Sequence, residues 1–209
     1  MKTKRNIRRR APKGPTSILR LSRRAGLLRP RDLEREGVPR VYLQRMVRRG
    51  LLVKRGRGLY GLPDAEVTEH HSLAQIAKRI PQCVVCLLSA LRYHSLTTQT
   101  PFEVWVALVR GARSPRGDEP KLHVVRFSGA AMNAGIEIKT IENVSVRIYG
   151  VAKTVADCFK FRNKIGIDVA IEALRESWRR KRCTMDELWR FARVCRVANV
   201  MRPYLEMLT

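Results

Sequence analysis

No stretch of this sequence is apolar for long enough to cross a membrane. The longest apolar run, residues 83–88, lies in the middle of the chain and is far shorter than the roughly 18 residues that a membrane-spanning helix needs. The basic N-terminus leads into further charged residues and not into an apolar segment, so we expect no export signal. These features predict a cytoplasmic protein with no membrane partner.

The sequence also lacks the cysteine pattern of a disulfide framework or a zinc finger. Five cysteines, an odd number, are scattered through helical patterns, which is typical of reduced thiols in a cytoplasm. Cys83 and Cys86 form a single CxxC pair, but structural zinc needs four ligands and no second pair follows at finger spacing. We therefore predict buried free thiols, with no metal and no cofactor.

Acidic residues are scarce in the first part of the chain. Residues 1–63 hold 20 Lys/Arg and three acids, a net charge of +17. Residues 64–209 hold 23 Lys/Arg and 15 acids, a net charge of +8. From residue 16 onward the cations alternate with apolar residues, so a folded scaffold carries them. Positive charge concentrated on one folded domain is typical of a polyanion-binding module, and we predict that the polyanion is double-stranded DNA.

Changes in composition divide the chain into four segments. Residues 1–15 have seven cations and no acid, which predicts a basic disordered arm that is either solvated or lies along DNA. Residues 16–63 form the predicted DNA-binding domain, and the polar residues 64–72 form a linker. Residues 73–209 form a larger α+β domain.

The pattern of residues 16–63 predicts a winged helix-turn-helix. Helices are expected over residues 16–26, 30–36 and 39–50, because Gly and Pro separate three segments of helical periodicity. Two short strand-like segments follow on either side of the Gly-Arg-Gly turn of residues 56–58. Such a turn projects one arginine from the tip of a hairpin, which would be the wing.

A helical wheel of the third predicted helix separates a core side from a solvent side. Tyr42, Leu43, Met46 and Val47 fall on the core side, and the solvent side carries residue types that reach base edges and phosphates. Gln44 and one arginine of this side are expected to read bases in the major groove. The DNA-contacting residues predicted on this helix, the hairpin and the first helix are Arg40, Gln44, Arg45, Arg48, Arg55, Arg57, Arg20, Arg23 and Arg24.

After residue 72, strand patterns precede helical ones. This order predicts a small, mainly antiparallel sheet with helices gathered in the C-terminal half. Residues 110–120, rich in Gly, Pro and mixed charge, predict a mobile loop. Strands are expected over residues 102–109, 122–127, 136–141 and 144–149, and helices over residues 72–79, 86–94, 152–162, 167–180, 184–194 and 198–208.

Several segments, in this order and spacing, resemble the AbiEi family, the antitoxins and transcriptional autorepressors of type IV (abortive-infection) toxin–antitoxin systems. The most specific are Ser-Ala-Leu at residues 89–91 and Lys-Thr-Val-Ala-Asp at residues 153–157, and the others are residues 43–51, 57–61, 104–106, 165–166 and 170–174. The resemblance implies that the N-terminal domain binds an operator, which we expect to be an inverted repeat, and represses its own operon. It also implies that the C-terminal domain opposes a nucleotidyltransferase-like toxin without forming a stable complex.

The sequence does not predict an enzyme. Glu137-Ile138-Lys139 matches half of a metal-dependent nuclease site, but no upstream Asp on a neighbouring strand completes it. Lys153 and Asp157, four residues apart, predict an ion pair on a helix surface. His94, at the end of an apolar helix, is predicted to be a capping or core residue. The alternative to a repressor is an RNA-binding or toxin-countering interaction protein without operator specificity.

Overall fold

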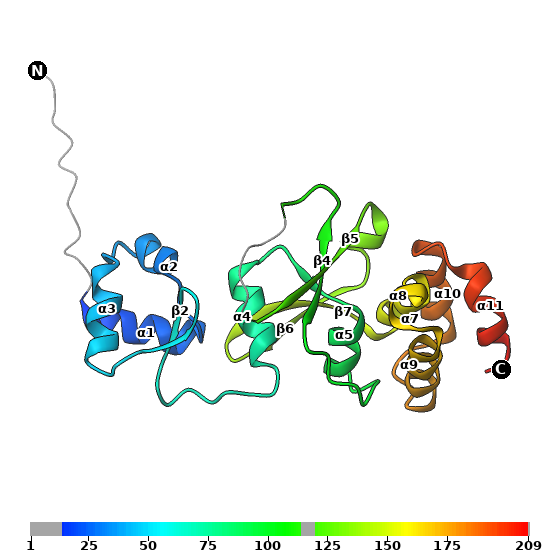
Figure 1. Ribbon diagram of the computed structural model, residues 1–209, viewed down its shortest axis with the longest axis horizontal. Helices are drawn as coiled ribbons and strands as arrows, with labels where there is room; N and C mark the ends of the chain where they lie inside the picture. Colours follow the sequence, from blue (N-terminus) through cyan, green and yellow to red (C-terminus); the bar gives the residue numbers. More distant parts are fainter. Residues whose placement is uncertain (1–13, 114–119, 209) are drawn as a thin grey trace, which may run out of the picture. The chain divides into compact units, whose positions relative to one another are not determined.

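The computed structural model of the chain describes residues 14–113 and 120–208. The chain divides into two compact units between Glu66 and Val67, a point inside the segment predicted to be a linker. Figure 1 shows the helices and strands of each unit. The basic arm predicted over residues 1–15 falls, apart from its last two residues, outside the described part of the chain.

The first unit consists of three helices followed by a two-stranded hairpin. Its seven core side chains come from all three helices and from the segments that join the elements: Ile18, Leu28, Leu33, Val38, Leu43, Met46 and Leu52. Burial of each large aliphatic side chain stabilises such a core by about 1.5–3 kcal/mol. The elements are α1 (Pro15–Ala25), α2 (Pro30–Arg35), α3 (Val41–Arg48), β1 (Val53–Gly56) and β2 (Leu59–Gly61).

The turn between α2 and α3 has a defined geometry. Gly37 adopts a φ of +72°, and its N–H donates to the carbonyl of Glu34 at 3.0 Å while Val38 N–H donates to the carbonyl of Leu33 at 2.9 Å. These two bonds form a Schellman motif, in which a glycine with positive φ ends the helix and the following apolar residue packs back on it. Leu33 and Val38 both lie in the core of the unit, so the turn fixes where α3 begins.

A backbone bridge ties the hairpin to the helices. Leu28, in the segment between α1 and α2, donates its N–H to the carbonyl of Tyr60 at 2.8 Å and accepts the N–H of Tyr60 at 3.0 Å. The segment before α2 therefore lies beside β2 as a third, one-residue strand. The sequence pattern did not predict this bridge, because a single paired residue leaves no alternation to detect.

The second unit contains a mixed five-stranded sheet with the order β5-β4-β3-β7-β6. The pairs β3/β4 and β6/β7 are antiparallel, whereas β4/β5 and β3/β7 are parallel. The β6–β7 hairpin turns at Glu142 and Asn143, whose φ values of 49° and 60° are those of the tight turns that suit the twist of a hairpin. The strands are β3 (Val84–Val85), β4 (Val104–Val109), β5 (Leu122–Phe127), β6 (Ile136–Ile141) and β7 (Val144–Tyr149).

Eight helices accompany this sheet in the part of the unit that the structure describes. The sheet and the helices α5 to α11 share one core, with α7 in the middle, packed against α5, α9, α10 and α11, whereas α4 packs on β4, β6 and β7. In Figure 1 the helices from α7 onward gather at the end of this unit that carries the C-terminus. The helices are α4 (His71–Arg79), α5 (Leu87–Tyr93), α6 (Ala130–Asn133), α7 (Val151–Lys160), α8 (Arg162–Ile165), α9 (Ile167–Arg179), α10 (Met185–Val194) and α11 (Ala198–Glu206).

The last residues of the predicted linker belong to the second unit. The carboxylate of Glu142 accepts the backbone N–H of Thr68 at 2.8 Å and its hydroxyl at 2.9 Å, and it lies 2.6 Å from Nδ1 of His71. Although partial burial raises the pKa of Glu142, these hydrogen bonds together hold it below its ordinary value. The turn between β6 and β7 thereby anchors the start of α4.

The α+β fold class predicted from the sequence is confirmed, with a helical N-terminal unit and helices concentrated near the C-terminus. In detail, the larger sheet is mixed and not mainly antiparallel. The sequence patterns missed β3, α6 and α8, which have two, four and four residues and are too short to show a period. Most of the predicted mobile loop, residues 114–119, lies outside the described residues.

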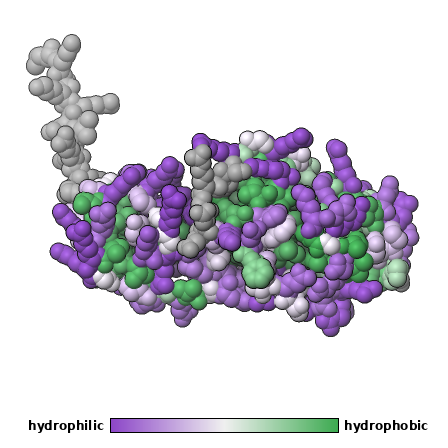
Figure 2. Space-filling view, viewed as in Figure 1, coloured by the Kyte–Doolittle hydropathy of each residue, from purple (hydrophilic) through white to green (hydrophobic). Residues whose placement is uncertain are grey.

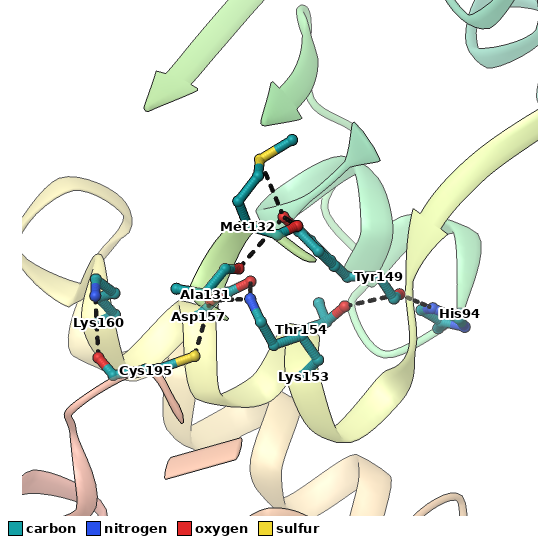
Figure 3. Close-up of polar contacts among 9 residues, drawn as sticks. All are labelled: His94, Ala131, Met132, Tyr149, Lys153, Thr154, Asp157, Lys160 and Cys195. Carbon is teal, nitrogen blue, oxygen red and sulfur yellow. Dashed lines mark hydrogen bonds and ion pairs between the residues drawn. The ribbon is translucent and has the colours of Figure 1, made fainter. Parts of the chain in front are cut away.

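The predicted surface ion pair of Lys153 and Asp157 is wrong, because both side chains are completely buried in the second unit. Figure 3 shows the arrangement. Lys153 Nζ donates to the two carboxylate oxygens of Asp157 at 2.7 and 2.5 Å, and Cys195 Sγ lies 3.2 Å from Oδ1 of the same carboxylate. The ammonium also lies 4.0 Å from the centre of the Tyr149 ring.

The reason for the error is that α7 has no solvent face. All residues from Val151 to Phe159 are buried, since the sheet and the helices α5, α9, α10 and α11 surround this helix. Burial raises the pKa of Asp157, and the adjacent Lys153 ammonium and the hydrogen bonds oppose that shift. Apart from these two charges, residues 151–159 are apolar or small on every side of the helix, and that feature of the sequence distinguishes it from a surface helix.

We expect replacement of either partner to destabilise the protein severely. Asp157→Asn or Lys153→Met leaves one charged group buried without its counter-charge, a change that costs about 3–5 kcal/mol in other buried pairs. The double variant Lys153→Met/Asp157→Leu should recover most of that loss, because no unpaired charge remains. Urea denaturation measures the three free energies of unfolding.

The matched control is the exposed ion pair of Arg179 and Glu176 on α9. Arg179→Gln should leave the unfolding midpoint almost unchanged, because solvent screens an exposed pair. Single variants of Lys153 or Asp157 that are as stable as this control would contradict the structural account of α7.

Candidate nucleic-acid interface

The core packing of α3 determines which of its side chains face solvent. Leu43 and Met46 are buried in the first unit, at 2% and 1% exposure. At 100° per residue, Gln44, Arg45 and Arg48 project from the opposite side of the helix, and all three are exposed. The predicted division of this helix into a core side and a polar side therefore agrees with the structure.

Arg45 on this face and Arg40 just before α3 each contact a neighbouring side chain. The Arg45 guanidinium lies 5.6 Å from the centre of the Tyr42 ring, a cation–π arrangement that limits the rotamers of Arg45. Arg40, just before α3, forms an exposed ion pair with Glu34 of α2. Exposed pairs of this kind are weak, so a phosphate could replace the Glu34 carboxylate as the partner of Arg40.

The hairpin places one exposed arginine at its tip. Gly56 and Gly58 have φ values of 153° and 69°, and the strand register is irregular between Lys54 and Gly56. Glycine at both positions lets the chain reverse around Arg57 without steric strain. The side chains of Lys54 and Arg57 are exposed, so the wing presents two cations.

Arg55 has a different environment from the one predicted for a DNA-contacting residue. Its Nη2 donates to the backbone carbonyls of Leu62 at 2.9 Å and Pro63 at 3.1 Å. Its side chain also crosses Gly61, where a Cβ atom would lie only 3.2 Å from Arg55 Cγ. Arg55 thus joins β1 to the segment that follows β2. We assign it a supporting role in the wing and leave it out of the contact surface proposed below.

The three arginines predicted on α1 are exposed. Arg20 and Arg24, one turn apart, line a groove of about 310 Å³ together with Ser17 and Glu36. Arg23 is exposed on the same helix. Side chains at this spacing on α1 can contact successive phosphates of one strand.

The described part of the first unit carries a large excess of positive charge. Residues 14–63 contain 13 Lys/Arg and three acids. Two of the acids have basic neighbours, since Asp32 accepts the backbone N–H of Arg29 at 2.9 Å and Glu34 pairs with Arg40. Figure 2 shows hydrophilic side chains projecting over much of the visible face of this unit. A polyanion would meet little opposing negative charge here.

The cysteines and the Glu137/Lys139 pair, the metal and catalytic candidates of the sequence, lie in the second unit. Among residues 14–113 and 120–208 there is no group of three or more His, Cys, Asp or Glu placed to hold a metal ion. Glu137 and Lys139, the proposed half of a nuclease site, pair with each other at 2.7 Å. All five cysteines are buried free thiols, and burial raises the pKa of each one.

No helix in the described part of the chain combines the length and the apolar character that crossing a membrane would require.

A sequence comparison relates the first unit to a family of transcriptional regulators. Residues 17–63 match the family model described as "Transcriptional regulator, AbiEi antitoxin". The resemblance to the AbiEi family is therefore confirmed, with the match located on the unit that contains α1 to β2. A search of curated proteins gave no match.

A structural comparison supports the fold of both units. The chain is similar to the crystal structure of the RV2827C protein from Mycobacterium tuberculosis, with a TM-score of 0.56 and 16% sequence identity. The match covers 87% of this chain and 72% of the other. At this level of identity the similarity concerns the fold alone.

We expect Arg55 and Arg57 to differ in their effects on stability. Arg55→Met removes two charge-assisted hydrogen bonds to carbonyls at the base of the wing, so the first unit should lose about 1–3 kcal/mol of stability. Arg57→Met, at the exposed tip, should leave stability unchanged. Native-state hydrogen exchange at the amides of β1 and β2 measures both effects. Equal protection of the two variants would show that Arg55 does not support the wing.

Proposed function

We propose that the protein is a sequence-specific DNA-binding repressor that acts as the autoregulating antitoxin of its own operon. The observation that carries the proposal is the exposed face of α3, with Gln44, Arg45 and Arg48 opposite the buried Leu43 and Met46. A helix of this width fits the major groove of B-DNA, where Gln pairs with adenine and Arg with guanine. The match of residues 17–63 to a family of transcriptional regulators supports it.

The remaining exposed cations of the first unit suit contacts to phosphates. Arg57 and Lys54 of the wing would lie on the backbone or in the minor groove beside the site. Arg40 would exchange Glu34 for a phosphate, and Arg20, Arg23 and Arg24 would contact the backbone from α1. Phosphate contacts of this kind set the position of the protein on the duplex, whereas base contacts from α3 would set the sequence that it prefers.

The proposed operator and partner rest on the family resemblance. We propose that the operator is an inverted repeat upstream of the protein's own gene. We further propose that the second unit counters a nucleotidyltransferase-like toxin without forming a stable complex with it.

The salt dependence of binding tests the electrostatic part of this proposal. If α3, the wing and α1 together neutralise about six to ten phosphates, affinity for promoter DNA should fall roughly 10³- to 10⁵-fold between 50 and 200 mM salt. Fluorescence anisotropy with a labelled promoter duplex gives the slope. An affinity that hardly changes with salt would exclude a phosphate-contacting surface.

Substitutions within and beside α3 test the assignment of base contacts. Gln44→Ala and Arg48→Ala should each reduce the preference for operator over random duplex by about 1–3 kcal/mol, the usual value of one bidentate base contact. Arg57→Ala should instead weaken binding to both duplexes by the same factor. Competition assays with operator, random duplex and tRNA report the three affinities.

The control for this series is Arg202→Ala, because Arg202 is an exposed arginine on α11 of the second unit. This substitution should leave the affinities for operator, random duplex and tRNA unchanged. If tRNA competes better than the operator in the unmodified protein, an RNA-binding function replaces the repressor proposal.

A further inference from the structure

A polar crevice opens on the second unit, and none of the residues proposed to contact DNA lines it. It has a volume of about 460 Å³ and lies between the start of α4, the end of α5, the strand β6 and the turn that follows α9. A smaller hollow of about 180 Å³ adjoins it and shares Glu137, Val151 and Arg182 with it. The two together have the size of a small-ligand site. The polar side chains that line the crevice are His70, Tyr93, His94, Glu137, Lys139 and Arg182.

Two arginines in this region have no acidic partner. The guanidinium groups of Arg182 in the crevice and Arg190 in the hollow form no ion pair or hydrogen bond with any residue in the described ranges. Arg190 lies instead over the ring of Phe191, 4.6 Å from its centre. Unpaired guanidinium groups beside a hollow are suited to bidentate binding of a phosphate or a carboxylate.

The structure already holds one anion at this place. The carboxylate of Glu137 lies against Gly150, where a Cβ atom would be only 2.4 Å from Oε1, and Gly150 is the residue that precedes α7. A negative charge therefore lies beside the N-cap residue of this ten-residue helix, where the partial positive charge of a helix N-terminus favours it. Lys139 pairs with the same carboxylate at 2.7 Å. Glu137 thus occupies part of an anion-binding environment.

His94 supplies an unused hydrogen-bond acceptor. It is 5% exposed, and its Nε2 lies 2.8 Å from the carbonyl oxygen of Tyr149, so Nε2 must be the protonated nitrogen (Figure 3). Burial lowers the pKa of His94, which keeps the ring neutral. Its Nδ1 is then an acceptor, and it has no hydrogen-bond partner among residues 14–113 and 120–208. Cations and a neutral acceptor that line one crevice suit a ligand that carries both an anion and hydroxyl groups.

We propose that this crevice binds a small phosphorylated ligand of the sugar-phosphate or mononucleotide class. Arg182 and Lys139 would hold the phosphate near the start of α7, and His94 Nδ1 would accept a hydrogen bond from a hydroxyl group. Tyr93, whose ring edge packs on His94 at 5.3 Å, would border the sugar. Binding would compete with the Glu137 carboxylate for the same cations. The site is independent of the DNA-binding proposal, since no residue is shared.

The test is an NMR titration of the full chain with AMP, inorganic phosphate and adenosine at constant salt. AMP should give saturable shifts at the amides of Val151 and Ala152, and adenosine should bind at least tenfold more weakly. Arg182→Ala should weaken AMP binding at least tenfold, because a bidentate phosphate contact is lost. Glu137→Gln should strengthen it several-fold, because a competing negative charge is removed.

Arg179→Ala is the matched control, because Arg179 lies three residues from Arg182 but pairs with Glu176 and does not line the crevice. It should bind AMP like the unmodified protein. Equal weakening by Arg179→Ala and Arg182→Ala would show diffuse attraction to a basic protein and overturn the proposal, as would the absence of saturable shifts.

The terminal phosphate of a nucleic acid has the same chemistry as the phosphate of a small ligand. Titration with a single-stranded hexanucleotide, with and without a 5′-phosphate, distinguishes nucleic-acid ends from small ligands. A preference for the phosphorylated oligomer that depends on Arg182, without binding of AMP or inorganic phosphate, would assign the crevice to nucleic-acid ends and reject a small ligand.

Discussion

The packing of Leu43 and Met46 into the small core of the first unit is the interaction on which the arrangement of its basic surface depends. These two side chains fix the rotation of α3 about its axis, and the Schellman motif at Gly37 fixes where that helix begins. Together they direct Gln44 and Arg48 away from the core. The bridge between Leu28 and Tyr60 holds the hairpin to the same framework, so the direction of the exposed polar face follows from apolar packing and backbone hydrogen bonds and not from the charges themselves.

The second unit depends on a different kind of interaction. Its central helix, α7, carries a fully buried ion pair of Lys153 and Asp157, which the Cys195 thiol and the Tyr149 ring complete. The carbonyl of Tyr149 in turn accepts hydrogen bonds from His94 and Thr154. Through the Tyr149 carbonyl and His94, the hydrogen bonds of the core therefore extend to the crevice at the start of α7. A ligand in that crevice would contact elements that the buried pair holds in place.

The sequence predicted much of the first unit and less of the second. Glycines, prolines and helical periodicity located α1 to α3 and the wing, because each leaves a local pattern within a few residues. Local patterns could not predict that Arg55 turns back to the carbonyls of Leu62 and Pro63, or that Leu28 pairs with Tyr60, since both contacts form between separate segments. The i, i+4 spacing of Lys153 and Asp157 predicts a surface pair, because most ion pairs at this spacing lie on helix surfaces. The crevice draws on four separate elements, and no sequence motif marks it.

We propose that the exposed face of α3 and the tip of the wing bind the promoter of the protein's own gene. Hydrogen–deuterium exchange of the whole chain, with and without that promoter duplex, tests this proposal. Binding through these elements should give new protection within Val41–Arg48 and at residues 56–58, with little change in α9 to α11. Protection confined to the second unit, or none in α3, would contradict it.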